Sequence, residues 1–171
     1  MSSAACCVHL IDVGTQETDG QDFQRLVYLG WEVVGGEAEG SGRRPLVYKS
    51  YVLSLSGSSQ LKVDVERLLG HELTPERIRR FDLKSVLGKC CYLNTAVDSV
   101  GGTAQTSTPT ICPLPSCVLR PSLPTPLTPH GIFMTSDPDM DLYEMLPSEI
   151  QQKIRSSPEF LAAMSANDAE D

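Results

Sequence analysis

The alternation of apolar and polar residues predicts three strands in the first 55 residues. Residues 7–13 mix valine, leucine and isoleucine and stop at Gly14, as a strand does. Residues 23–34 place apolar side chains at spacings of two and four, ahead of a glycine pair. Residues 46–55 are rich in aromatic and β-branched residues, which favours a third strand.

The next segment changes to a helical period. Residues 58–70 open with serine, close with glycine and repeat apolar side chains on one helical face. We expect burial of each such side chain to contribute about 1.5–3 kcal/mol. A second, shorter helical turn begins at Thr74, with Pro75 at its first position. The apolar face of the first helix consists of Leu61, Val65, Leu68 and Leu69.

Two further strands follow. Residues 89–97 alternate, and a hairpin-like turn at 98–102 leads to a weaker strand at 104–111. Three strands, a helix and two strands is the element order of an OB barrel. The predicted fold class is therefore all-β with a helical insertion: a five-stranded OB-type barrel, followed by a proline-rich linker and an acidic C-terminal tail.

Proline spacing sets the predicted domain boundaries. Seven prolines between residues 109 and 129 disfavour a regular helix or a central strand. We therefore predict a barrel domain at 1–115, a Pro-rich linker at 116–136 and an acidic tail at 137–171. Within the tail, residues 148–156 carry a cap-like serine and two isoleucines four apart, which predicts a short helix.

The net charge of −8 is unevenly distributed. Residues 1–120 hold 12 Lys and Arg against 13 Asp and Glu, whereas residues 121–171 hold 2 against 9. The acidity belongs to the last third of the chain, so the predicted barrel is compatible with a polyanionic ligand.

Location and redox state follow from what the sequence lacks. Residues 1–10 have neither the basic start nor the apolar run of a secretory signal, and no stretch is long enough to span a bilayer. We expect a cytoplasmic protein with no membrane contact. The six cysteines are then expected to be reduced thiols.

Motifs for catalysis and for cofactors are missing. The cysteines form adjacent pairs rather than Cys-x-x-Cys knuckles, and neither a phosphate-binding glycine loop nor a nucleophile triad is present. The sequence therefore predicts no enzyme, no metal and no cofactor.

Aromatic and basic residues gather on the second and third strands. Single-stranded nucleic acid needs rings on which bases stack and cations for the phosphates. Alternation places Tyr48 and Tyr51 on opposite faces, and Lys49 on the face of Tyr51; Trp31 belongs with the buried set. Lys49 and Tyr51 are accordingly the preferred pair. The predicted nucleic-acid-binding residues are Arg25, Tyr28, Arg43, Arg44, Tyr48, Lys49, Tyr51, Lys89 and Tyr92.

Two basic clusters have an ordinary alternative. Arg43 and Arg44 end a Gly-rich loop that is either a basic finger or a solvated hairpin loop. Arg77, Arg79 and Arg80 follow the second helical turn. A solvated helix face is their default interpretation, and contact with phosphate is the alternative.

Several segments resemble a family of short phage-encoded proteins. They are Ile11-Asp-Val-Gly-Thr-Gln, Phe81-Asp-Leu-Lys-Ser-Val-Leu-Gly-Lys-Cys-Cys-Tyr-Leu-Asn, Cys112-Pro-Leu-Pro, Leu146-Pro-Ser-Glu-Ile-Gln-Gln-Lys-Ile and Ser157-Pro-Glu-Phe. The resemblance covers roughly residues 8–160. It implies an OB-like, single-stranded DNA-binding protein of phage replication or recombination. The chain departs from the pattern at 101–107, where the family carries a Lys/Tyr-containing stretch, so ligand contacts from the fifth strand are in doubt.

Two functions from different classes remain open. The first is single-stranded DNA binding in phage DNA replication or recombination, in the host cytoplasm. The alternative is a protein-binding adaptor or virion-associated module that uses the same barrel or the helix at 148–156. In the first case the acidic tail is expected to compete for the basic groove, or to recruit replication or recombination proteins. Removing residues 130–171 would then leave the barrel folded and raise its affinity at low salt.

Overall fold

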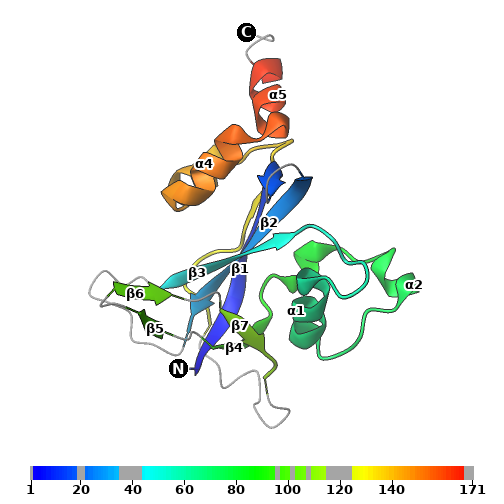
Figure 1. The fold of residues 1–171 in the computed structure, drawn as a ribbon, viewed down its shortest axis with the longest axis vertical. Helices are drawn as coiled ribbons and strands as arrows, with labels where there is room; N and C mark the ends of the chain where they lie inside the picture. The colour runs from blue at the N-terminus through cyan, green and yellow to red at the C-terminus, as the bar shows by residue number, and fades with distance from the viewer. Residues whose placement is uncertain are drawn as a thin grey trace.

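A computed structural model describes residues 2–18, 22–34, 44–94, 97–100, 103–106, 109–114 and 125–167, with only the backbone described at 97–100 and 103–106. A six-stranded sheet forms its centre (Figure 1). Its strands are β1 (Ser2–Thr18), β2 (Asp22–Val33), β3 (Leu46–Val52), β4 (Cys90–Asn94), β7 (Thr110–Cys112) and β8 (Gly131–Phe133). A separate hairpin contains β5 (Val97–Val100) and β6 (Thr103–Thr106).

Helices lie in two groups. The connection from β3 to β4 contains α1 (Gln60–Leu69), α2 (Pro75–Ile78) and the 3-10 helix η1 (Leu83–Val86). The C-terminal part contains α3 (Met140–Met145), α4 (Ser148–Ser156) and α5 (Pro158–Asn167). The predicted helix at 148–156 therefore matches α4, and the predicted turn after Thr74 matches α2.

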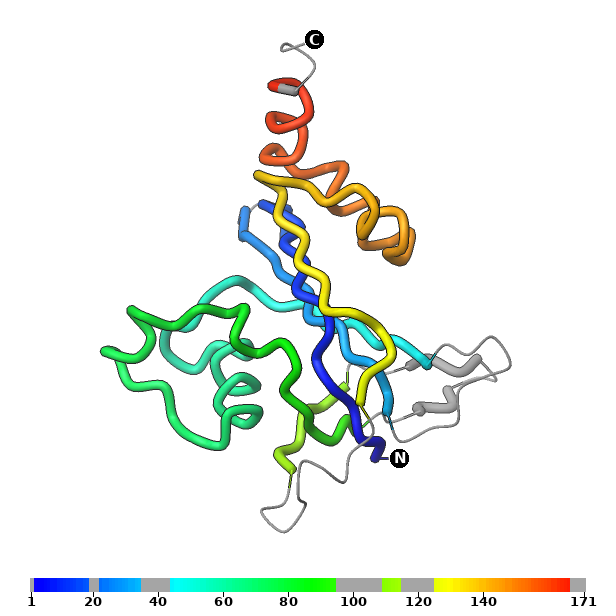
Figure 2. Tube along the Cα trace, turned by 180° about the vertical axis from the view of Figure 1, so that it is seen from behind, coloured from blue at the N-terminus to red at the C-terminus, as the bar shows by residue number. Residues whose placement is uncertain are grey.

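β1 organises the sheet. One edge of β1 pairs with β2 along almost its whole length. Its other edge pairs first with β4, through residues 2–6, and then with β8, through residues 9–11. The β8 pairing is parallel, and Figure 2 shows this C-terminal segment running beside β1. Two register shifts, between Cys7 and His9 and between Asp12 and Gly14, interrupt the long β1–β2 ladder.

The prediction of a β-rich fold with a helical insertion is confirmed, whereas a closed five-stranded barrel is not shown. The strand order is β3-β2-β1-β4-β7, and α1 packs against both end strands, β3 and β7. In the described residues no pairing joins β3 to β7, so the structure is a β-rich fold with an open sheet and a few helices. The predicted weak fifth strand at 104–111 is divided between β6 and β7.

Two hydrophobic cores lie on opposite faces of the sheet. We call the face under α1 the α1 face, and the opposite one the C-terminal face. The α1 face buries Trp31, as predicted, together with the apolar side of α1; Leu69 is only half-buried. The other members are Ala5, Cys7, Leu10, Val27, Leu29, Tyr51, Leu73, Val86, Cys91, Leu93 and Ile111.

The C-terminal face carries a second core that the sequence did not predict. Ile11 and Val13 of β1 are fully buried there, and β8 contributes Phe133. The predicted linker thus ends in a strand of the central sheet, and the predicted acidic tail packs on the sheet as far as α5. The helices supply Leu142, Leu146, Ile150, Ile154 and Phe160.

Gly14 lets α5 approach β1 closely. Its φ of +71° is left-handed, and a Cβ at this position would lie 2.6 Å from Glu159 Oε2. Glu159 accepts hydrogen bonds from the Thr15 backbone N–H, at 2.9 Å, and from the Thr15 hydroxyl. A side chain at position 14 would push α5 off the sheet.

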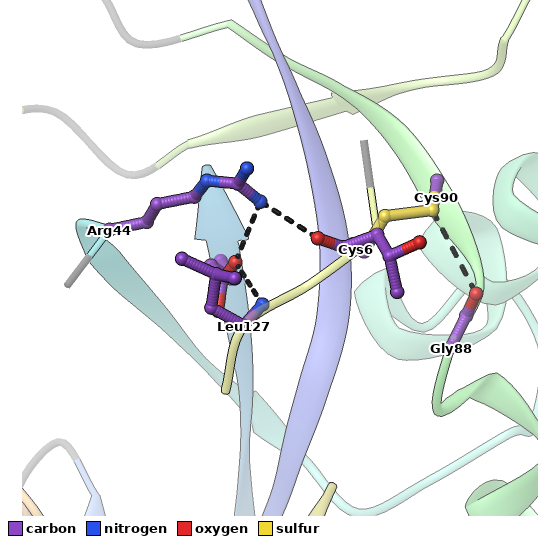
Figure 3. Close-up of a disulfide and its surroundings, with 7 residues drawn as sticks. Cys6, Arg44, Gly88, Cys90 and Leu127 are labelled. Carbon is purple, nitrogen blue, oxygen red and sulfur yellow. Dashed lines mark hydrogen bonds and ion pairs between the residues drawn. A yellow bond between two sulfur atoms is a disulfide. The ribbon is translucent and has the colours of Figure 1, made fainter. Parts of the chain in front are cut away.

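A disulfide joins β1 to β4. Cys6 and Cys90 are opposite each other in the antiparallel register and are bonded through their sulfurs (Figure 3). The prediction that all cysteines are reduced is therefore wrong for this pair. Cys7, Cys91 and Cys112 are free thiols, and burial raises the pKa of Cys91 to about 12.

Candidate nucleic-acid interface

The predicted ligand pair lies in the protein interior. Lys49 is 7% exposed and Tyr51 is 3% exposed, and both side chains lie on the α1 face. The Lys49 ammonium is 2.7 Å from Asp64 Oδ2, and the Tyr51 hydroxyl donates to the same oxygen at 3.1 Å. Burial, followed by the Asp64 charge, raises the pKa of Tyr51 far above its ordinary value. The prediction that these two side chains present a ligand surface is wrong, because α1 covers them.

Asp64 is the polar centre of this packing. It is 1% exposed, and its other carboxylate oxygen accepts from Gln60 at 3.0 Å and from Arg67 at 3.3 Å. A buried carboxylate requires such partners, since an unpaired charge in the interior costs several kcal/mol. The network holds α1 against β3.

The other predicted tyrosines lie on the C-terminal face. Tyr28 and Tyr48 are half-buried and pack against the second core. Tyr48 lies across Gly30, where a Cβ would be 2.7 Å from its ring, and hydrogen-bonds His9 Nδ1 through its hydroxyl at 2.8 Å. Burial raises the pKa of Tyr48 to about 12. Both rings are thus partly engaged in packing, which limits the surface they offer for base stacking.

Arg25 is partly exposed but paired. Its Nε is 3.2 Å from Asp12 Oδ1, and its Nη2 forms an ion pair with Oδ2 of the same carboxylate. Asp12 also accepts from the Gly14 backbone N–H at 3.0 Å, and it is almost fully buried. Arg25 thus neutralises a buried acid.

Arg44 is likewise bound to a carboxylate. Its Nη1 lies 3.3 Å from Glu32 Oε1 and donates to the Thr125 carbonyl at 2.9 Å. Glu32 is fully buried and also accepts from the backbone N–H groups of Leu127 and Thr128, at 2.8 and 2.6 Å. Burial opposes ionisation of Glu32, but the hydrogen bonds from Thr128, Leu127 and Arg44 outweigh it and lower its pKa. This cluster fixes the start of the C-terminal segment to the sheet, and Figure 3 shows Arg44 beside Leu127.

The three remaining predicted residues are Lys89, Tyr92 and Arg43. Lys89 and Tyr92 are half-buried at β4. Arg43 lies outside the described residues, so the basic-finger hypothesis at this loop stays a prediction. The structure therefore does not bring the described members of the predicted set together on one surface.

A cleft lies beside α3, which belongs to the C-terminal helices. It has a volume of about 760 Å³ and lies between the start of β3, residues 127–131 and α3. Its wall includes His9, whose pKa is lowered by burial, a shift that Glu32 partly offsets. Three acids, two in α3 and one at its N-cap, also line it, which disfavours a polyanion there. They are Asp139, Asp141 and Glu144.

A second groove carries the opposite charge. Its volume is about 890 Å³, and it lies between the end of α1 and the α2–η1 segment. Arg77, Arg79 and Arg80 line it and are exposed, together with half-buried Phe81. Arg77 reaches the neighbouring His71 Nδ1 at 3.2 Å, while the side chains of Arg79 and Arg80 make no hydrogen bond within the described part of the chain. We call this set of three residues the arginine cluster.

The described residues contain no group of three or more His, Cys, Asp or Glu side chains arranged to hold a metal ion. They also contain no helix long and apolar enough to cross a membrane. Comparison of the whole chain with protein-family models, curated proteins and solved structures found no match.

Proposed function

We propose that this protein binds single-stranded DNA through an OB-type fold and acts in phage DNA replication or recombination. The observation that carries the proposal is the strand order. An OB barrel opened between its third and fifth strands has the order 3-2-1-4-5, with a helix between strands three and four. The order β3-β2-β1-β4-β7, with α1 between β3 and β4, is the same.

The helix position supports the same topology. In an OB barrel the helix covers the end of the barrel next to the third and fifth strands. Here α1 packs against both β3 and β7, and the Lys49–Asp64 ion pair holds it there. The two strands that a closed barrel would pair, β3 and β7, are therefore both in contact with α1.

The ligand surface must differ from the one predicted from the sequence. OB folds commonly bind strands across the outer face of strands two and three. In this protein the corresponding side chains, such as Tyr28 and Tyr48, lie against the second core. A DNA strand must therefore use surface that the C-terminal helices leave open.

A fluorescence-anisotropy titration with labelled oligothymidylate tests the proposal. Binding should be measurable at about 50 mM salt and should weaken steeply towards about 200 mM, because phosphate contacts release counterions. Duplex DNA of equal length should bind more weakly. A lack of binding to the oligonucleotide at the lower salt concentration would refute the function.

A protein-binding adaptor is the second candidate, and exposed apolar side chains favour it. Leu127 is 57% exposed, Met145 66% and Leu161 55%. Apolar side chains at this exposure are typical of docking surfaces when they form one patch. This function would be favoured by two results together. The protein would not bind the oligonucleotide, and a protein partner that binds wild type would not bind the Met145→Ser variant.

A further inference from the structure

Among the described residues, the Lys and Arg side chains of the central sheet that form ion pairs are distinguished from exposed arginines that form none. Every ion pair in the described residues joins a Lys or Arg of β2, of α1 or of the β3 region to a carboxylate. The five cations used in this way are Arg25, Arg44, Lys49, Lys62 and Arg67. Cations that already neutralise a carboxylate offer little attraction to phosphate.

The arginine cluster has no such partner. Within the described part of the chain, none of Arg77, Arg79 and Arg80 lies in an ion pair, although the chain has 22 acidic residues. Glu76 and Asp82 also line the groove, but Asp82 accepts a hydrogen bond from the Lys84 backbone N–H at 2.9 Å as the cap of η1. Lys84 adds a fourth cation within eight positions.

We infer that the arginine cluster holds the phosphates of the bound strand, with the backbone of the DNA running through the groove between α1 and the α2–η1 segment. This inference rests on the proposed function and gives it a location. Arginine suits this role because its planar guanidinium donates two parallel hydrogen bonds to a phosphate. No residue of the C-terminal helices lines the groove. A DNA strand can therefore reach it without displacing the second core.

The cluster is poorly explained as packing. The three side chains are exposed, and Arg79 and Arg80 support no neighbouring group in the described residues. Their replacement should therefore leave the fold intact. Arg77 contacts His71 and the Glu72 carbonyl, so it is left unchanged in the test.

The test compares two charge-matched double variants in the full chain. R79Q/R80Q removes two cations from the groove, and K153Q/R155Q removes two unpaired cations from α4. Each phosphate contact to a single strand contributes about −0.7 to the slope of log affinity against log salt. R79Q/R80Q should thus lower the slope by about 1.4, which makes its loss of oligothymidylate affinity roughly sevenfold larger at about 50 mM salt than at about 200 mM.

A charge-retaining variant separates electrostatics from folding. R79K/R80K should keep most of the salt slope, and K153Q/R155Q should keep all of it. If wild type binds and R79Q/R80Q has an unchanged slope, the groove assignment is wrong while the proposed function stands. If wild type does not bind, both fall. A competition experiment tests the phosphate assignment. If an aspartate-rich peptide displaces the labelled oligonucleotide as well as an unlabelled oligonucleotide of the same charge does, the assignment is wrong and an acidic protein partner is favoured.

Discussion

At the residue scale, buried carboxylates explain why two of the cations predicted to bind nucleic acid, Lys49 and Arg44, carry no free charge. Lys49 neutralises Asp64 and Arg44 neutralises Glu32, and both acids are essentially inaccessible to water. Alternation correctly separates Tyr48 from Tyr51, but it cannot tell which face meets solvent. Because both faces of this sheet are covered, neither ring lies free, and the spacing alone gives no sign of that.

Removing Asp64 should strongly destabilise the protein. Asp64→Asn leaves the Lys49 ammonium buried without a counter-charge, which costs about 3–5 kcal/mol. The free energy of unfolding, from urea denaturation, should fall by that amount. Replacing both partners with apolar residues, as in K49M/D64L, should restore much of the loss. A single variant as stable as wild type would show that the ion pair is dispensable.

Glu32 should give the protein a pH-dependent attachment of its C-terminal segment. Its pKa is lowered in the folded protein, so its contribution is present above the ordinary pKa of a glutamate and is lost as the pH falls through the folded value. Glu159, on α5, shifts in the same direction because its hydrogen bonds with Thr15 outweigh burial. Both groups therefore weaken the attachment in acid.

Glu32→Gln should lower the free energy of unfolding by about 1–3 kcal/mol at neutral pH, because Arg44 loses its counter-charge. The difference from wild type should begin to shrink as the pH falls below the ordinary glutamate pKa of about 4.3, and should disappear only below the lower pKa of folded Glu32, where its carboxylate becomes protonated. Thermal melts across this range give the comparison. Glu72→Gln is the control, since Glu72 is exposed. A pH-independent difference would mean that Glu32 acts through packing rather than charge.

At the element scale, local signals predict the strands and helices more accurately than the connections between them. Ser59 caps α1 and Gly70 ends it with a φ of 74°, both of which are readable from the sequence. By contrast, β8 has three residues and follows a proline-rich stretch, so it is too short to show the alternation of apolar and polar residues that predicts a strand. Phe133 of β8 is buried in the second core with Ile11 and Val13 of β1 and with helices that lie further along the chain.

The disulfide joins two elements that are distant in sequence. Cys6 and Cys90 are separated by 84 residues, so closing this loop restricts the unfolded chain considerably. Reduction, or Cys6→Ser, should lower the free energy of unfolding by about 2–4 kcal/mol. Melts with and without dithiothreitol give the measurement. Cys112→Ser serves as control, because Cys112 is a free thiol. Equal stability of oxidised and reduced protein would show that strand pairing alone holds β1 to β4.

At the scale of the whole molecule, the chain folds as a sheet enclosed on both sides. The sequence predicts the end of a Pro-rich linker at 131–136 and an acidic tail with one short helix from residue 137, because prolines and acids dominate the composition. The few apolar residues there are nevertheless spaced so that α3, α4 and α5 each bury a side chain on the sheet. Composition reflects the many exposed polar residues of these helices and gives little sign of the few buried apolar ones. The sequence therefore does not predict that these helices cover the face that carries Tyr28 and Tyr48.

This packing reverses the expectation for a truncated protein. Deleting residues 131–171 uncovers Ile11 and Val13, both fully buried, and removes the strand paired with residues 9–11 of β1. Exposing these two side chains costs about 3–6 kcal/mol, a large part of the 5–15 kcal/mol that stabilises a typical domain. The deletion should lower the melting temperature, increase binding of the apolar dye ANS and cause self-association. A cleanly folded, monomeric deletion variant would show that the sheet is stable without its second core.

A shorter deletion tests charge competition without disturbing the core. Removing residues 168–171, Asp-Ala-Glu-Asp, takes away three acidic side chains and leaves every residue of the second core in place. If these acids compete with DNA for the arginine cluster, the shortened chain should bind oligothymidylate more tightly at low salt. The gain should fade towards about 0.15 M salt, where the Debye length is about 8 Å. In R79Q/R80Q the same deletion should produce a smaller gain, because the cations for which the tail competes are missing. An equal gain in both backgrounds would mean that the tail repels DNA through net charge alone, without occupying the groove.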